Sequence, residues 1–494
     1  MSKSFQMVRN ARKTLVEQKQ ESKKSDPYKV IVVSEAGDGP HAPTSKNQEY
    51  FRTARRVLEE CKKQKIECYI LSIDGAYFKS IENVHRVHNK DDPKGFVVDT
   101  NTIVIVRGPA FMRLSWLDLI SQLERTGATM VNSRDTLAVC SDKYRAAIRL
   151  ERDGLTQPKT ALIPNESGVK LAVENLDVDF PVVLKTLEGS KGVGVVFIES
   201  ARSLDAIVQL LFKQDPEADL LLQQYIKTNF DVRVIVLNDT VMAAMSREVL
   251  EGDFRSNFSQ GAKVKEYKLT ALEIEQSLLA AKAVSGVWTA VDFIPSQKPK
   301  KEPPYILEVN HSPGTEGIET ATGRNIIKEL LDYFQNPKNR HPVALEVGRF
   351  ERLEILGVGK IVANFDTGNS ARAIMHCDEW EVKDKKVIWK NNGKTFKHDL
   401  VKMRTYEQGK WSWSSKTPIE RPSIHLDIDF NGRVYKDVQF IVDDRSHKVT
   451  KCLMNQTFMR RANVMVNPAK TFVVSTKHGV EPDGTFKKGA FDLF

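Results

Sequence analysis

The sequence predicts three folded regions in series: an α/β domain, an α+β domain and a mostly β domain. Buried-strand patterns alternate with helical patterns from Lys29 onward, and strands mix with helices from about residue 136. Short alternating strands dominate after about residue 345. The length of 494 residues is enough for several domains, each with its own core.

Composition narrows the class of protein. The chain is 41% hydrophobic and 28% charged, which excludes a collagen-like, coiled-coil or mostly disordered protein. No apolar run approaches the length of a membrane span and no signal peptide is recognisable, so we expect a cytoplasmic protein without a membrane partner. The five cysteines include no CxxC pair, which argues against a disulfide framework. The net charge of +10 favours an anionic partner and fits equally a mildly basic surface.

The first domain is predicted over residues 28–135, after a polar tail over 1–27. Its strand and helix patterns alternate, with strands at 29–34, 68–73 and 102–107 and helices at 47–63 and 114–125. This alternation predicts a parallel sheet covered by helices.

The second domain is predicted over residues 136–337, and a linker over 338–345 follows it. Its predicted strands lie at 181–187, 195–199, 220–226, 231–237, 241–249, 290–294 and 305–309. Its predicted helices lie at 203–213, 271–285 and 323–334. The third domain is predicted over 346–478, with strands at 360–363, 380–382, 387–389, 423–430 and 438–442, and a tail over 479–494 ends the chain.

A glycine-rich turn follows Lys185 in the second domain. It contains Gly189, Gly192 and Gly194. Glycines let backbone N–H groups approach phosphates closely, and a lysine supplies positive charge. No GxxxxGK[ST] pattern occurs, so the segment is not a P-loop, and by itself it also fits a plain hairpin turn.

Carboxylate and amide side chains lie on two successive predicted strands. They are Asp292, Glu308 and Asn310. Glu308 and Asn310 are two residues apart, so they point to the same face of their strand. Buried charges need partners, and oxygen ligands of this kind suit Mg²⁺. A salt bridge at a strand end explains the same pattern equally well.

An arginine-containing stretch over residues 246–257 follows another predicted strand. It carries Arg247 and Arg255, with Ser256 and Asn257 beside them. Arginine binds phosphate or carboxylate groups through two parallel hydrogen bonds. A solvated charged loop fits the same composition.

Together these segments resemble the ATP-grasp fold, and specifically the ribosomal protein S6 glutamate ligase (RimK-like) family. The resemblance covers about 28–337 and rests on NSRD at 132–135, VLKTLEGSKGVGV at 183–195, EGDFRSN at 251–257 and ILEVNHSPGTEGIE at 306–319. It implies a pre-ATP-grasp α/β domain followed by an ATP-grasp domain that uses ATP and two ions of Mg²⁺ or Mn²⁺. One departure is His311, where the family usually has a small residue.

The resemblance implies a role for each matching position. The implied ATP contacts are Lys143, Lys185, Gly189, Gly192 and Gly194 at the phosphates, Gln224 and Tyr225 at the adenine, Asp231 at the ribose, and Arg255, Ser256 and Asn257 at the phosphate and substrate end. The implied metal ligands are Asp292, Glu308 and Asn310. Gln224 is a second departure, because a carboxylate is common there.

The implied reaction is ATP-dependent amide formation. A substrate carboxylate attacks the γ-phosphate of ATP, and an amine then displaces phosphate from the acyl phosphate. Arg233, Arg247 and Arg255 are the candidates for stabilising the oxyanion. The implied partners are glutamate or a similar amino acid and a protein or peptide acceptor. A nucleic acid would take part only indirectly, through a ribosomal acceptor.

The third domain carries Asp366 in an Asp-Thr-Gly turn after an apolar strand. About 346–475 resembles the retropepsin-like (RimB-like) family often labelled ATP-dependent zinc protease, on the stretches FDTGNSARA, ERP, VYKDVQFIVDDR and NPAKTF. The zinc label has no support from the sequence, which has no HExxH motif. An aspartic dyad needs two carboxylates, so activity would require a homodimer that pairs Asp366 with its copy. Asn455 departs from the glycine of the second retropepsin motif, which argues against a working protease.

The leading hypothesis is therefore an ATP-grasp ligase fused to a retropepsin-like domain. One alternative is an aspartic-type peptidase, dimeric through Asp366, whose ATP-grasp half acts as a regulator. Another is a non-catalytic protein that binds an extended peptide as a strand. An intact set of Asp292, Glu308 and Asn310 favours the ligase over both.

Overall fold

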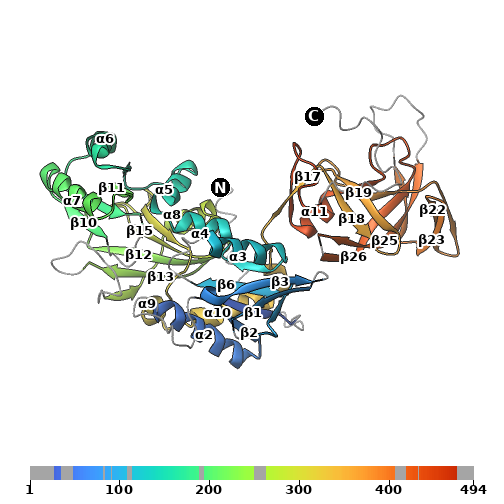
Figure 1. Ribbon diagram of the computed structural model, residues 1–494, viewed down its shortest axis with the longest axis horizontal. Helices are drawn as coiled ribbons and strands as arrows, with labels where there is room; N and C mark the ends of the chain where they lie inside the picture. Colours follow the sequence, from blue (N-terminus) through green and yellow to red (C-terminus); the bar gives the residue numbers. More distant parts are fainter. Residues whose placement is uncertain are drawn as a thin grey trace. The chain divides into compact units, whose positions relative to one another are not determined.

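The computed structural model describes residues 27–34, 48–81, 84–90, 92–107, 114–187, 194–249, 263–406, 419–431 and 433–475. The chain divides into two compact units, unit 1 (Met1–Pro342) and unit 2 (Val343–Phe494), as Figure 1 shows. The division falls inside the stretch expected to be a linker.

Unit 1 begins with a parallel sheet in the order β2-β1-β6-β7. Its strands are β1 (Lys29–Ser34), β2 (Glu67–Ser72), β6 (Thr102–Arg107) and β7 (Thr129–Val131), and α2 (Gln48–Gln64) and α3 (Leu114–Arg125) lie between them in sequence. All six residues of β6 are buried, as expected for a strand in a parallel sheet covered on both faces. The predicted α/β architecture of this region is confirmed.

A smaller antiparallel sheet follows, in the order β10-β9-β11-β8. Its strands are β8 (Thr160–Ile163), β9 (Val182–Thr186), β10 (Val195–Ile198) and β11 (Leu220–Gln224). Apolar side chains of these strands share a core with α6 (Val169–Leu176) and α7 (Ala201–Gln214). Figure 1 shows this sheet and its helices at the opposite end of unit 1 from α2 and β2.

A larger antiparallel sheet, in the order β14-β13-β12-β15-β16, forms the centre of unit 1. Its strands are β12 (Phe230–Leu237), β13 (Thr240–Glu248), β14 (Val264–Glu266), β15 (Trp288–Ile294) and β16 (Tyr305–Asn310). On one face, Val232 and Val234 share a core with residues of α5 (Lys143–Arg152) and α8 (Ala271–Ala283). On the other face, Ile235 and Leu237 share a core with β1, β6 and α10 (Ile326–Gln335). Residues of the first two predicted domains therefore form one continuous core.

Three features of unit 1 differ from the sequence-based expectation. Between β2 and β6 in the sequence, the chain forms a separate antiparallel sheet of β3 (Tyr77–Ile81), β4 (Val84–His88) and β5 (Phe96–Val98). The helices α4 (Arg134–Cys140), α5 and α6 and the strands β7, β8 and β14 were not predicted either. The helix predicted over 323–334 corresponds to α10, and an unpredicted helix, α9 (Glu316–Thr322), precedes it and ends at Gly323, which takes a left-handed φ of 68°. Asn325 then caps α10 by accepting a hydrogen bond from the N–H of Lys328.

Unit 2 is a β-barrel, which confirms the mostly β prediction. In the described part of the chain its strands follow the order β18-β19-β27-β20-β26-β25-β24, and β18 also pairs with β25, which closes the barrel. These strands are β18 (Phe350–Ile355), β19 (Gly359–Phe365), β20 (Ala373–His376), β24 (Lys402–Tyr406), β25 (Ile419–Phe430), β26 (Arg433–Asp443) and β27 (Cys452–Met454). Phe365, Phe430 and Tyr435 pack around Phe458 in its core.

Shorter elements complete unit 2. A meander of β21 (Glu379–Lys383), β22 (Lys386–Asn391) and β23 (Lys394–Asp399) packs Trp389 and Val387 into the barrel core. β17 (Leu345–Gly348) pairs in parallel with β28 (Val464–Asn467), next to α11 (Gln456–Ala462). Across both units, no helix within the described ranges is long and apolar enough to cross a membrane.

Candidate active site

Lys185 lies near the end of β9, and its ammonium group has a neutral partner. Nζ donates to Oε1 of Gln223 at 2.6 Å, and Nε2 of Gln223 donates to Oγ1 of Thr160 at 3.1 Å. Burial lowers the pKa of Lys185, while the charge of Glu308 opposes this shift and that of Lys143 adds to it. Sequence patterns missed Gln223, because β11 ends in two glutamines and only the strand register decides which one meets Lys185.

Lys143 reaches the same place from α5. The side chain of Asp142 caps this helix by accepting from the N–H of Arg145, and Lys143 is its first residue. Nζ of Lys143 donates to the carbonyl oxygens of Thr186 at 3.1 Å and Leu187 at 3.0 Å. Both predicted phosphate lysines therefore meet at the end of β9, where the glycine-rich turn begins.

Gly194 closes the far side of that turn. Its φ is +79°, and a Cβ added there would lie 2.3 Å from Oγ1 of Thr186. Glycine is therefore required at this position both for the backbone conformation and for the close approach to β9. Gly189 and Gly192 lie outside the described residues, so their predicted contacts stay predictions.

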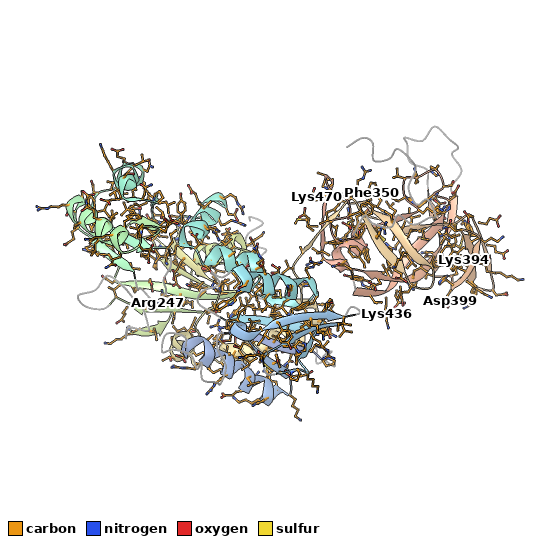
Figure 2. All side chains as sticks on the ribbon, viewed as in Figure 1. Arg247, Phe350, Lys394, Asp399, Lys436 and Lys470 are labelled. Atoms are coloured by element: carbon orange, nitrogen blue, oxygen red, sulfur yellow. The ribbon has the colours of Figure 1, made fainter. Side chains whose placement is uncertain are left out.

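One face of the larger sheet carries charged side chains across neighbouring strands, and we call this set the charged row. In strand order it consists of Arg247 on β13, Asp231 and Arg233 on β12, Asp292 on β15 and Glu308 on β16. The register pairs opposite charges twice, Asp231 with Arg247 and Arg233 with Asp292, and it pairs Asp292 with Glu308, which carries the same charge. Figure 2 labels Arg247 within this sheet.

Asp292 is the buried centre of the charged row. Nε and Nη2 of Arg233 donate to its Oδ1 and Oδ2 at 2.7 and 2.6 Å, and Nη2 of Arg247 lies 3.0 Å from Oδ2. Burial alone would raise the pKa of Asp292, but the two guanidinium groups outweigh it and hold the pKa well below its usual range. Asp292 is therefore a stable carboxylate at neutral pH.

Asp231 has a different partner from the one the family resemblance implies. Its Oδ1 and Oδ2 accept from Nε and Nη2 of Arg247 at 2.7 and 2.6 Å. Both side chains are buried. The ribose contact of Asp231 stays a prediction, and in this structure its carboxylate is engaged with Arg247.

The predicted metal ligands offer only oxygen atoms. Nδ2 of Asn310 donates to Oε1 of Glu308 at 3.0 Å, so the two side chains share a face of β16, as their spacing predicts. Arg233 Nε fills one of the two lone-pair positions on Oδ1 of Asp292. Carboxylate and amide oxygens are the donors that Mg²⁺ prefers, so this set fits the ion chemically.

Within the described ranges, no group of three or more His, Cys, Asp and Glu side chains is arranged to hold a metal ion. The predicted set contains only two such residues, and its third ligand is the amide of Asn310. Its role in metal binding stays a prediction.

The predicted adenine contacts lie at the end of β11. Gln224 pairs with the backbone of Lys159, donating its N–H at 2.8 Å and accepting at Oε1 at 3.3 Å. The ring of Tyr225 meets that of Phe197 edge to face, with centroids 5.0 Å apart. The adenine contact itself stays a prediction.

Asn132 fastens the loop that follows β16. Its Nδ2 donates to the carbonyl oxygens of Trp288 at 2.8 Å and His311 at 2.6 Å, and its Oδ1 accepts from the N–H groups of Val287 and Trp288 at 2.7 and 3.0 Å. Burial lowers the pKa of the His311 imidazole to about 4, so the side chain is neutral at neutral pH. Sequence patterns included Asn132 in a motif but did not reveal this role, because its partners lie about 155 to 179 residues away.

The remaining ATP and substrate contacts that the resemblance implies are those of Arg255, Ser256 and Asn257. All three lie outside the described residues, so their roles stay predictions.

Unit 2 places Asp366 directly after β19 in the expected turn. Its Oδ1 accepts from the N–H of Gly368 at 2.9 Å. Asn455 joins this segment to α11, because its Nδ2 donates to the carbonyl of Ala371 at 2.8 Å and its Oδ1 accepts from the N–H of Phe458 at 3.0 Å. The residue that departs from the retropepsin motif thus has a structural role as a helix cap.

Comparisons with known proteins place unit 1 among ligases. The model of the RimK-like ATP-grasp domain matches residues 140–334. A probable alpha-L-glutamate ligase 2 of Shewanella amazonensis is 30% identical over 285 residues, which are 57% of this chain and 91% of the relative. A probable alpha-L-glutamate ligase of Pseudoalteromonas translucida is 31% identical over 294 residues, which are 59% of this chain and 93% of the relative.

Two solved structures are also similar. The ATP-grasp ligase PsnB complexed with a minimal precursor is 17% identical, with a TM-score of 0.47, over 63% of this chain and 100% of that one. The D-alanine–D-alanine ligase of Bacillus anthracis is 17% identical, with a TM-score of 0.45, over 63% of this chain and 97% of that one.

Proposed function

This chain belongs to the RimK-like ATP-grasp family of glutamate ligases, and from that membership we propose that it joins glutamate, or a similar amino acid, to a carboxylate of a protein or peptide. It is an ATP-dependent ligase that forms an amide bond. The identity of the amino acid and of the acceptor is the part that remains a proposal.

The observation that carries this function is the meeting of two sets of charges from different sheets. Lys143 and Lys185 come together at the end of β9 in the smaller sheet. Glu308, in the charged row of the larger sheet, acts electrostatically on Lys185. ATP with a divalent cation needs both sets, because phosphates attract ammonium groups and the cation attracts carboxylates.

The proposed reaction has two steps. A carboxylate oxygen of the acceptor bonds to the γ-phosphorus as the bond to the β–γ bridging oxygen breaks, which yields ADP and an acyl phosphate. The amine nitrogen then bonds to the acyl carbon to form a tetrahedral oxyanion. The bond from that carbon to the phosphate oxygen breaks, and the proton lost by the nitrogen leaves with the phosphate. Lys143 and Lys185 stabilise the phosphate charge, and Arg233 and Arg247 stabilise the oxyanion.

Asp292, Glu308 and Asn310 are the residues that would hold Mg²⁺, as two ions. When bound there, the metal would neutralise charge on the transferred phosphoryl group. Mn²⁺ prefers similar oxygen ligands and would fit the same site.

The test is ADP release by the full chain with ATP, Mg²⁺, single amino acids and a cell extract as the source of acceptor. We expect release that depends on glutamate or a similar amino acid, and mass spectrometry should find that amino acid added to a protein or peptide. Glu308→Gln should lose both signals. Release that needs no amino acid, or no release with any of them, would contradict the proposal.

For unit 2 we propose a retropepsin-like identity and a role in docking or processing the acceptor. The supporting observation is the Asp366 turn, which follows a barrel strand and is tied to α11 through Asn455. On this proposal Asp366→Asn leaves the ligation rate within about twofold of wild type, since the carboxylate is not part of the ligase site. A loss of ligation in this variant would contradict it.

The peptidase alternative makes a different prediction for the same residue. It requires a homodimer that brings two copies of Asp366 together, and Asp366→Asn would abolish cleavage. Light scattering at micromolar concentration and a peptide library test both requirements. A monomer that cleaves nothing would exclude this alternative and leave the ligase function unaffected. The homodimer and the cytoplasmic location stay predictions.

A further inference from the structure

The small sheet of β3, β4 and β5 has one face in the core and one face in solvent. Phe78, Val87 and Phe96 lie on the inner face and pack into the core beneath the first sheet. Successive residues of a strand point to opposite faces, so the alternate residues of β3 and β4 form the outer face. We call this surface the hairpin face, and it consists of Tyr77, Lys79 and Ile81 on β3 and Val84, Arg86 and His88 on β4.

Two cations lie directly opposite each other at the centre of the hairpin face. The register pairs Lys79 with Arg86, and like charges in directly opposed positions destabilise a pair of strands. In the described part of the chain neither side chain forms an ion pair, and Nη1 of Arg86 donates to the backbone carbonyl of Lys94 at 3.3 Å. The fold thus keeps concentrated positive charge here, and a bound anion would relieve the repulsion.

Apolar and aromatic side chains flank these cations on both sides. Ile81 and Val84 pair at the tip of the hairpin and are 54% and 47% exposed. At the other end Tyr77 is 45% exposed, and its ring stacks on the buried imidazole of His88 with centroids 4.7 Å apart. Single exposed apolar side chains are common, but several on one small face mark an interaction site. The hairpin face therefore suits a partner with anionic groups at its centre and apolar groups on either side.

β3 is also the free edge of this sheet. The strand order is β3-β4-β5, and within the described ranges β3 pairs with no strand other than β4. A free edge presents a row of backbone N–H and C=O groups, with which an extended segment can pair as an added strand. A lysine on an edge strand hinders pairing with a second copy of the same strand. Lys79 favours an acidic strand for the same reason, because a carboxylate beside it is attracted.

The base of the hairpin lies at the carboxyl ends of the parallel strands. β2 ends at Ser72 and β3 begins at Tyr77, and the Oδ1 of Asn89, directly after β4, accepts from the N–H of Ser72 at 2.7 Å. Arg107 ends β6 at the same edge and donates to the carbonyl of Pro313 at 2.9 Å, shortly after the proposed metal ligands of β16. Ligands of α/β sheets bind outside the carboxyl ends of the strands. The base of the hairpin face and the proposed ligase site thus share one edge of the first sheet.

We propose that the hairpin face and the free edge of β3 bind an extended acidic segment of the acceptor as an added strand. This inference rests on the proposed function, because it assigns the surface to the protein or peptide that is modified. Addition of glutamate consumes one carboxylate and supplies two, so the product carries one more negative charge than the acceptor. A face that binds acidic strands therefore suits both the acceptor and the product.

The first experiment measures peptide binding by the full chain without ATP, Mg²⁺ or amino acids. The probe for fluorescence anisotropy is the labelled, capped peptide VTETVTETV, whose valines and glutamates alternate on one face of a strand and match Tyr77, Lys79 and Ile81. We expect saturable binding that weakens as salt is added, and binding of VTQTVTQTV that is about tenfold weaker. Equal binding of the two peptides, or no saturable binding of the acidic one, would overturn the proposal.

Charge reversal tests whether the hairpin face is the binding surface. Lys79→Glu combined with Arg86→Glu should bind VTETVTETV at least about tenfold more weakly than wild type and should bind VTKTVTKTV more tightly than wild type. The matched control is Lys282→Glu combined with Lys338→Glu, because both lysines are exposed elsewhere in unit 1 and the change in net charge is the same. An equal loss in the control would show general charge attraction and would contradict the assignment.

A proline-containing probe separates strand pairing from charge attraction alone. VPEPVPEPV keeps the valines and glutamates, but it lacks alternate backbone donors and is disfavoured in strands. We expect it to bind at least about tenfold more weakly than VTETVTETV. Equal binding would exclude the added strand. Labelled oligothymidine tests a different partner, and binding that is tighter than that of the acidic peptide and is lost on charge reversal would assign the face to nucleic acid instead.

Competition in the ligase assay connects the hairpin face to the acceptor. With cell extract as the source of acceptor, VTETVTETV should inhibit amide formation by wild type, and the charge-reversed protein should need about tenfold more extract for half-maximal rate at an unchanged Kd for ADP. If amide forms and neither effect appears, this inference fails while the proposed function stands. If the charge-reversed protein shows no melting transition, Lys79→Gln replaces it with the same expected directions.

Failure of the proposed function gives a different result. Wild-type protein would then form no amide with any amino acid, whereas the anisotropy measurements need no turnover. They still decide whether the hairpin face binds an acidic strand.

Discussion

Asp292 in unit 1 and Glu351 in unit 2 are both buried carboxylates, but their partners differ. Asp292 is held by the guanidinium groups of Arg233 and Arg247, which lie on neighbouring strands. Glu351, on β18, is fully buried, and its oxygens accept from the backbone N–H groups of Gly348 at 2.7 Å, Val473 at 2.7 Å and Ser475 at 3.1 Å, and from the Ser475 hydroxyl at 2.6 Å.

This difference in partners is the one expected between a carboxylate of the proposed active site and a carboxylate that only stabilises the fold. Guanidinium partners can shift by side-chain rotation, so Asp292 can share its oxygens with a ligand while the sheet stays intact. Backbone partners can move only with the chain, so Glu351 fixes the segment over 470–475 to the barrel. Arg349 and Phe350 add backbone bonds to that segment at 2.7 and 2.8 Å, and Figure 2 shows Phe350 and Lys470 close together.

The largest expected effect is on turnover in Asp292→Asn. On the proposal that Asp292 holds Mg²⁺, its substitution removes a metal ligand and leaves Arg233 and Arg247 without their shared anion, so ATP turnover should fall about 1000-fold. The measurement is ADP release, with circular dichroism to confirm that the variant is folded. Asp239→Asn, at the exposed turn between β12 and β13, is the matched control. Turnover near wild type in Asp292→Asn would place the active site elsewhere.

Glu351→Gln should affect stability and spare turnover. The amide cannot accept at both ends, so the N–H and hydroxyl of Ser475 lose their acceptor inside the barrel. We expect the free energy of unfolding of unit 2 to fall by about 1–3 kcal/mol, the cost of an unsatisfied buried group. Urea titration of the full chain measures this, and Glu354→Gln on the same strand is the control. A variant as stable as wild type would contradict the structural role.

The smallest expected effect is a pH dependence that comes from His376 in unit 2. Burial lowers the pKa of this imidazole below its ordinary value of 6.5, with Lys451 adding to the shift and Asp378 and Asp444 opposing it. Its Nδ1 accepts from the backbone N–H of Arg445 at 3.0 Å. Protonation would put a hydrogen on Nδ1, so that two N–H donors would face each other. The unfolded chain therefore binds a proton more readily than the folded chain does.

The sign of the effect follows from this difference. The stability that neutral His376 contributes is complete above pH 6.5 and is lost as the pH falls through the lowered pKa of the folded state. His376→Asn keeps an acceptor near Nδ1 and cannot be protonated, so its melting temperature should fall less between pH 7.5 and 5.5. The difference should be a few degrees, since about 1 kcal/mol shifts the melting temperature of a domain of this size by roughly 2–4 °C. Parallel pH profiles for wild type and variant would exclude this origin.

Local patterns were enough to predict the strands of the charged row. β12 and β15 are runs of buried apolar residues, which any assignment by periodicity detects. The spacing of Glu308 and Asn310 placed both on one face, and the hydrogen bond between them confirms it. The local pattern was also enough to predict that Lys185 lies on a strand just before the glycine-rich turn.

The sequence alone could not predict which charged residues pair across neighbouring strands. Arg233 and Asp292 are 59 residues apart, and they meet because β12 and β15 pair in one particular register. That Asp231 faces Arg247 depends on the register of β12 with β13, which shifts between Ile235 and Val236. A one-residue change in register would place these side chains on opposite faces, so no local signal could have identified the partners.

Asn132 has a consequence for dissecting the chain into fragments. Its side chain binds backbone groups of Val287, Trp288 and His311. Apolar residues of β1, β6 and α10 also share one core with Ile235 and Leu237 of the larger sheet. A fragment that starts at residue 136 would lose that amide and leave one face of the larger sheet open to water. We therefore expect the ATP-grasp region to fold only together with residues 28–135. A fragment made for study should end at Pro342, the end of unit 1, and should not begin after the first sheet.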